Sequence, residues 1–198
     1  ELARVIVAPQ AGMPEATSLL SRALQEASKR AKERGAKPAR SGEVAELRNM
    51  QDVTAEQQAQ RVISMVMGQS EQSVIIVYAF WNVFQDESVP VVANAYRNPL
   101  VYRAGQVITE RRIDASRDEE DILRQVSAFI STDVRNKAIA DKMIPAQGHE
   151  QSLGAVSPEM VFNLVADLKR LGRSVRLQAL ARNDTRAADP LQLDFRVR

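Results

Sequence analysis

Short apolar runs alternate with amphipathic stretches in the first half of the chain. Arg4–Ala8 is a short apolar run that suits a buried strand, and Val74–Trp81 is the most apolar and β-prone run. Between them, Leu20–Ala31 and Val62–Met67 place apolar residues at the spacing of one helix face. We interpret the weaker pattern of Glu43–Met50 as a further strand. Strands that alternate with helices predict a mainly parallel sheet with helices packed on it, a βαβαβ-like half.

The second half begins with short β-prone segments that are separated by turn residues. Val89–Ala95, Leu100–Arg103 and Gln106–Ile113 have this pattern, which favours antiparallel hairpins and predicts a meander. Near the C-terminus, Val175–Ala179 and Leu191–Arg198 are expected to be the final strands of the same sheet. The last of them alternates apolar and polar residues, so we expect one of its faces to be buried and the other to be wet.

Helix-start signals support this order of elements. Thr54 and Ser116 are each followed three residues later by Gln or Glu, which is the spacing of a capping box. Ser157 precedes a proline, a common start of a helix. The helices that follow Ser116 and Ser157 carry apolar faces over Ile122–Val134 and Val161–Leu171. The predicted fold class is therefore α/β in the α+β sense, with a mixed sheet and helices packed on it.

The size of the chain allows a substantial core. The chain has 198 residues, of which 44% are hydrophobic, and we expect one globular domain over 1–198, with 1–85 and 86–198 as candidate subdomains. The first residue is Glu1 rather than Met, which indicates a processed or excised piece of a longer chain. No apolar run approaches the ~20 residues of a membrane-spanning helix, and nothing resembles a signal peptide.

Charge and cysteine content limit the kinds of site that the chain can form. The absence of cysteine excludes disulfides, thiolate metal sites and a cysteine nucleophile. The net charge of +2 does not by itself indicate a nucleic-acid-binding protein. From residue 169 to 198, however, eight basic residues stand against three acidic ones, a local excess of five positive charges. We favour an ordinary solvated arginine-rich face over a binding surface as the explanation of this excess.

No catalytic arrangement emerges from the sequence. The acidic run Asp118–Asp121 is consecutive on a helix and cannot converge on one ion, so we interpret it as complementing the helix dipole. His149 is the only histidine and has no evident partner. Asp194 lies in a strand, as a ribonuclease H-like nuclease would require, but Val5–Ala8 and Val74–Val83 contain no acid. We expect no catalytic residues, no metal site and no cofactor.

Aromatic residues concentrate around the predicted meander. With Arg97 and Arg103 they could stack single-stranded nucleic acid, they could belong to the core, or the same edge could accept a protein partner by strand addition. The exposure of Trp81 and Tyr102 separates these alternatives. The aromatic residues are Tyr78, Phe80, Trp81, Phe84, Tyr96 and Tyr102.

Several motifs carry a resemblance to a known family. They are Leu2–Val7, Val89–Val91 leading to Asn98–Gly105, and Val175–Ala179 leading to Asn183–Thr185. On these motifs the chain resembles the C-terminal domain of the bacterial DUF3084 family, whose function is uncharacterised. The resemblance implies a membrane-anchored protein with two N-terminal spans, a long coiled-coil stalk and this domain at its end. By the positive-inside rule, a basic loop between the spans would place the domain outside the cytoplasmic membrane.

Two hypotheses of different classes follow. The first is a non-enzymatic binding or assembly module in the cell envelope, which becomes a homo-oligomer through the upstream coiled coil and meets a membrane only through the upstream anchor. The second is a nucleic-acid-binding domain, with a divergent nuclease as its extension and a cytoplasmic location. An uncharacterised hydrolase is a third alternative without assigned residues. The candidate binding residues are Trp81, Arg97, Tyr102, Arg103, Arg176, Arg182, Arg186, Arg196 and Arg198.

Overall fold

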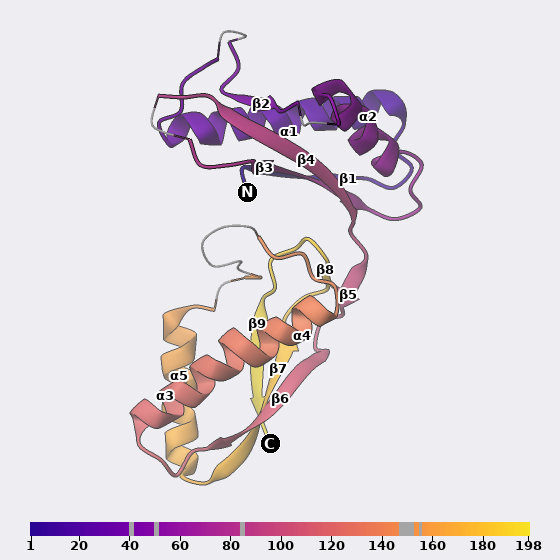
Figure 1. Cartoon of the computed structure of the whole chain (residues 1–198). Helices are drawn as coiled ribbons and strands as arrows, with labels where there is room; N and C mark the ends of the chain where they lie inside the picture. The colour runs from indigo at the N-terminus through magenta and orange to yellow at the C-terminus, as the bar shows by residue number, and fades with distance from the viewer. Residues whose placement is uncertain (40–41, 50–51, 84–85, 147–152, 155) are drawn as a thin grey trace. The chain divides into compact units, whose positions relative to one another are not determined.

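The chain divides into two compact units. The computed structural model describes residues 1–39, 42–49, 52–83, 86–146, 153–154 and 156–198 (Figure 1). Unit 1 is Glu1–Pro99 and unit 2 is Leu100–Arg198, and each has its own hydrophobic core. The boundary lies at Pro99 rather than after residue 85, because residues 89–97 form a strand of the unit 1 sheet.

Unit 1 contains a four-stranded sheet in the order β1-β3-β4-β2. Its strands are β1 (Ala3–Val7), β2 (Ala45–Leu47), β3 (Ser73–Ala79) and β4 (Val89–Arg97). Only β2 and β4 are parallel, while β1-β3 and β3-β4 are antiparallel, so the predicted mainly parallel sheet is wrong. The strongly apolar β3 occupies the centre between β1 and β4, and the three-residue β2 is left at the edge.

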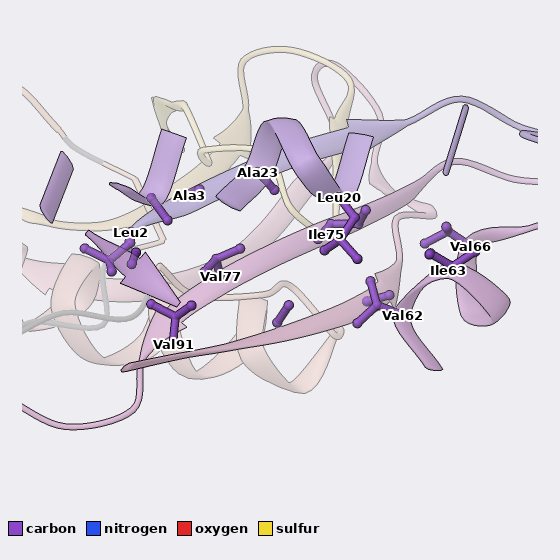
Figure 2. Close-up of a cluster of buried hydrophobic side chains, with 14 of the residues drawn as sticks. Leu2, Ala3, Leu20, Ala23, Val62, Ile63, Val66, Ile75, Val77 and Val91 are labelled. Atoms are coloured by element: carbon purple, nitrogen blue, oxygen red, sulfur yellow. The ribbon is translucent and has the colours of Figure 1, made fainter. Parts of the chain in front are cut away.

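Two helices cover one face of this sheet, α1 (Met13–Glu33) and α2 (Ala55–Val66) (Figure 1). Figure 2 shows Leu20 and Ala23 of α1 in the same buried cluster as side chains of α2 and of the sheet. The buried positions of α1 other than Leu20 are alanines, which allow the helix to pack closely. The capping box predicted at Thr54 is confirmed at the start of α2.

Unit 2 contains a three-stranded antiparallel sheet in the order β6-β7-β9 and a separate short pair, β5 with β8. The predicted meander is wrong, because β4, β5 and β6 pair with β3, β8 and β7 instead of with one another. The final strands likewise pair within unit 2 and do not complete the unit 1 sheet. The strands are β5 (Leu100–Tyr102), β6 (Val107–Asp114), β7 (Ser174–Ala181), β8 (Thr185–Arg186) and β9 (Leu193–Val197).

The helices of unit 2 pack on one face of the three-stranded sheet. They are α3 (Glu119–Ala128), the π-helix η1 (Phe129–Val134), α4 (Arg135–Ala140) and α5 (Pro158–Leu171). Leu177 of β7 is buried in one cluster with Ile122 of α3, Phe129 of η1 and Leu168 of α5. The predicted start of α5 at Ser157 is confirmed, whereas α3 is capped by Asp118 instead of Ser116. The mixed α+β class with helices packed on sheets is confirmed.

Candidate arginine-rich sheet face

Strand alternation in unit 2 directs arginine side chains to the face of the sheet opposite the core. Val175 and Leu177 of β7 point into the core, so Arg176 between them points away from it. Arg176 lies opposite Arg112 of β6. On the other side, the backbones of Arg176 and Arg198 exchange two hydrogen bonds of 2.9 Å. The three arginines therefore form one row across the sheet.

Two further arginines extend this row. Arg196 lies opposite Gln178, two residues along the strands and on the same face, and Arg182 follows β7 on the same side. We call Arg112, Arg176, Arg182, Arg196 and Arg198 the arginine face. All five side chains belong to exposed residues.

Few carboxylates offset this charge. Arg176 pairs with Glu110 at 2.9 Å, and Arg182 pairs with Asp194 at 2.8 Å. Within the described part of the chain, no ion pair is found for Arg196 or Arg198. The face thus presents five guanidinium groups against two carboxylates.

The acid nearest the end of the row has its own partners. Asp114 of β6 lies opposite Ser174, one position beyond the row of arginines. It accepts a hydrogen bond from the Ser116 hydroxyl at 2.6 Å and pairs with Arg117 at 3.2 Å. These donors, the Ser116 hydroxyl above all, lower the pKa of Asp114. Asp114 is therefore ionised at neutral pH, and its charge is engaged by Ser116 and Arg117.

A row of like charges is unfavourable for folding by itself. Directly opposed like charges on neighbouring strands are destabilising, by roughly 0.2–1 kcal/mol per pair. Arg112 and Arg176 are such a pair, and Arg176 and Arg198 are a second one. Anions bound between the guanidinium groups would relieve this repulsion. The electrostatics of the face therefore favour the binding of a polyanion.

The other predicted arginines lie elsewhere. Arg186 is in β8, half-buried, with its backbone N–H bonded to Asp189, and does not belong to the arginine face. Arg103 is exposed in the turn after β5, and Arg97 ends β4 in unit 1. Sequence reasoning missed Arg112, although it lies two residues after Glu110 in a predicted strand, a spacing that places both side chains on one face.

Tyr102 is buried and offers no ring face to a ligand. Its exposed fraction is 2%, and its hydroxyl donates to Asp141 Oδ2 at 2.7 Å. Burial and this hydrogen bond raise the pKa of Tyr102. The expected stacking role of Tyr102 is therefore corrected: the residue anchors β5 beside the end of α4.

Trp81 is exposed and lies in unit 1, two residues after the end of β3. Its ring meets that of Phe80 edge to face, with 5.1 Å between the ring centroids. Trp81 is 47% exposed and Phe80 is 45% exposed. The guanidinium carbon of Arg48 lies 3.6 Å from the centroid of the Trp81 ring and 4.6 Å from that of Phe80. We call Arg48, Phe80 and Trp81 the aromatic cluster. A cation over two exposed rings is a common feature of protein interfaces.

The remaining aromatic residues divide between core and surface. Tyr78 is buried, whereas Tyr96 is 37% exposed. Phe84 lies outside the described residues. The predicted set of aromatic residues therefore does not form one stacking surface.

Acidic residues at the start of α3 and in the turn after β7 have structural partners. Asp118 accepts from the backbone N–H of Asp121 at the start of α3, and Asp184 accepts from the N–H of Ala104 at 2.8 Å. Among the described residues, no three His, Asp or Glu side chains lie together in a way that could hold a metal ion. His149 lies outside the described residues.

No protein-family model matches the chain, and neither does any curated protein or solved structure. None of the helices in the described ranges is both long enough and apolar enough to cross a membrane. A proposal about function therefore starts from the geometry of the arginine face and of the aromatic cluster.

Proposed function

We propose that the chain is a non-catalytic binding module whose arginine face binds the phosphate backbone of nucleic acid. The observation that carries this proposal is the row of Arg112, Arg176 and Arg198 across three neighbouring strands. Guanidinium groups bind phosphate oxygens through paired N–H donors, and release of counterions from nucleic acid adds to the affinity.

The chemistry of the face favours backbone contacts over base contacts. The residues that β6, β7 and β9 direct to this face include arginines, Glu110, Gln178 and Asp194, and no aromatic ring is among them. Phe195 of β9 points to the core side. Stacking on aromatic rings is the main way in which proteins hold single strands, so we expect duplex nucleic acid to bind at least as well. Such binding depends little on base sequence.

The experiment that tests this function compares two double variants of the whole chain by fluorescence anisotropy on labelled duplex DNA at low salt. Arg196→Gln with Arg198→Gln removes two charges from the arginine face. Arg124→Gln with Arg170→Gln removes two charges from α3 and α5, on the helix side of the same unit. We expect the first pair to weaken binding about tenfold or more, and the second to change it about twofold at most. If both double variants weakened DNA binding equally, the binding would depend on net charge alone and not on the arginine face.

A second candidate function is assembly with a protein partner in the cell envelope. The aromatic cluster favours it, because exposed tryptophan and arginine side chains are frequent anchors of protein interfaces. The resemblance to the DUF3084 family supports presentation by a membrane-anchored coiled coil, where avidity strengthens weak contacts.

The two candidates require different sides of the membrane. A reporter that is active only outside the cytoplasmic membrane, fused to the C-terminus of the full-length protein, separates them. An active reporter favours envelope assembly, because nucleic acid is not the expected polyanion there. An inactive reporter, together with an active cytoplasmic one at the same position, favours nucleic-acid binding.

A further inference from the structure

The outer edge of β4 in unit 1 is only partly covered by another strand. β2 pairs with Val89–Val91, and the described residues provide no strand on that side for the rest of the nine-residue β4. Pro90 and Asn98 hydrogen-bond toward β3. Because these positions alternate along an antiparallel pair, Ala93 and Ala95 direct their N–H and C=O groups away from β3, to the open edge.

From Val89 to Ala93, backbone groups on the open edge have hydrogen-bond partners, but this pattern stops at Ala95. Val44 and Arg48, the residues on either side of β2, provide hydrogen-bond partners for the Val89 N–H and the Val91 C=O. The next position is served by a side chain, because Oε1 of the buried Gln58 accepts the N–H of Ala93 at 2.9 Å. At Ala95, no described residue provides a partner for the outward N–H or C=O. Among the described residues, the backbone of Ala95, a residue that is only 4% exposed, is therefore left without a pairing strand.

A groove runs beside this part of β4. It has a volume of about 410 Å³ and lies between α2 and β4. Val62 and Met65 of α2 form one wall, and Ala93, Ala95 and Tyr96 lie along the other. Met65 is 49% exposed, so its apolar side chain faces the solvent here. We call this site the edge groove.

The charge at the edge groove is positive. Arg61 of α2 lines it, and none of the residues that line it is acidic. Arg97 ends β4, and its side chain shares the helix-side face of the strand with Ala95. Both arginines are exposed, and neither makes an ion pair within the described ranges. An acidic side chain on an incoming segment would complement them.

We propose that the edge groove binds an extended segment of a partner protein that adds to β4 as a further strand. The segment pairs its backbone with Ala95, places apolar side chains against Val62 and Met65, and directs acidic side chains toward Arg61 and Arg97. Backbone pairing supplies affinity, and the alternating side chains supply specificity. This site is in unit 1 and is independent of the arginine face.

The test selects linear peptides of about twelve residues from a random displayed library on the whole chain, and measures their affinity by fluorescence anisotropy. We expect the selected peptides to alternate apolar and acidic residues. Ala95→Pro removes the outward N–H but no hydrogen bond to β3, and edge strands tolerate proline at such a position. We expect it to weaken peptide binding about tenfold.

Arg61→Glu is a second variant, on the exposed surface of α2. It tests the proposal even if Ala95→Pro does not fold. Its matched control is Arg22→Glu on α1, which makes the same charge change away from the groove. We expect about tenfold weaker binding for Arg61→Glu and no change for Arg22→Glu. Selected peptides that bind both groove variants like the unaltered chain, or a library that yields no binder, would overturn the proposal.

Self-association is the competing occupant of the edge groove. Light scattering on the unaltered chain and on Arg61→Glu distinguishes it. We expect the same mass for both. A dimer that Arg61→Glu dissociates would assign the groove to a second copy of the chain and overturn the proposed partner segment.

Discussion

At the scale of single residues, Tyr102 shows how burial changes the meaning of a residue type. An aromatic residue beside arginines in a β-prone segment is compatible with stacking on nucleic acid. The structure instead buries its ring and gives its hydroxyl the Asp141 carboxylate as an acceptor, while Lys137 donates to the same carboxylate. Sequence alone did not indicate this contact, because it joins residues that are 39 positions apart.

We predict that Tyr102→Phe destabilises unit 2 by about 1 kcal/mol, the typical net contribution of one hydrogen bond. Phenylalanine keeps the packing of the tyrosine ring, so the loss in the free energy of unfolding measures the contribution of the hydroxyl group. Urea unfolding followed by circular dichroism measures it. An unchanged midpoint would show that water replaces Tyr102 as the partner of Asp141.

A pH-dependent prediction concerns Asp141. Burial alone would raise its pKa, but hydrogen bonds from the Lys137 ammonium and the Tyr102 hydroxyl outweigh burial and lower that pKa. Since the folded pKa lies below the unfolded value of about 3.9, the stabilisation is complete above that value and is lost as the pH falls through the folded pKa. We therefore expect Asp141→Asn to reduce the loss of stability on acidification below pH 4. Equal acid sensitivity of the variant and the unaltered chain in urea titrations would contradict this.

At the scale of elements, local signals and long-range pairing differ in how well the sequence predicts them. The capping box at Thr54, the helix start at Ser157 and the inward face of β9 follow from neighbouring residues and were predicted. Strand pairing depends on contacts between distant segments, so the parallel first half and the meander were predicted wrongly.

The arginine face falls between these two cases. Alternation along β9 predicts that Arg196 and Arg198 share one face. That Arg112 of β6 joins the row across β7 follows only from the register of the three strands. The sequence therefore predicted part of the candidate site, and the pairing of distant strands completed it.

An element-scale prediction concerns the contact between α2 and β4. Gln58→Ala leaves the buried N–H of Ala93 without its acceptor, so we expect a loss of about 1–3 kcal/mol in the free energy of unfolding of unit 1. Gln60→Ala on the same helix is the matched control, because Gln60 is exposed, and its effect should stay within about 0.5 kcal/mol. Chemical unfolding measures both. Similar effects of the two variants would show that Gln58 is not needed at the edge.

The arginine face should limit the stability of its own sheet. We predict that Arg112→Thr raises the free energy of unfolding by about 0.5 kcal/mol at low salt, because it removes a like charge opposite Arg176 and introduces a β-prone residue. Salt screens the repulsion, so the gain should shrink as ionic strength rises. The same variant should bind duplex DNA more weakly. A variant that is both less stable and a weaker binder would assign Arg112 a structural role instead.

At the scale of the whole molecule, the two units have separate cores and separate candidate surfaces. The arginine face lies in unit 2, and the aromatic cluster and the edge groove lie in unit 1. A chain built in this way can combine two binding functions, and each can be removed without the other.

We predict that residues 1–99 and 100–198 fold when they are produced separately, because each carries its own core. Cooperative thermal unfolding of each piece measures this. The second piece should also retain the DNA binding of the whole chain, and the first piece should not bind DNA. A folded second piece that has lost DNA binding would show that the arginine face is not sufficient.

The measurement that tests the central claim most directly is the salt dependence of duplex DNA binding by the whole chain. Three arginines of the face, Arg112, Arg196 and Arg198, have no carboxylate partner among the described residues. Three phosphate contacts predict that log K falls with log salt concentration with a slope of about −3, and that Arg196→Gln with Arg198→Gln reduces its magnitude by about 2. Absence of binding at low salt, or a slope that the double variant leaves unchanged, would contradict the proposed function of the arginine face.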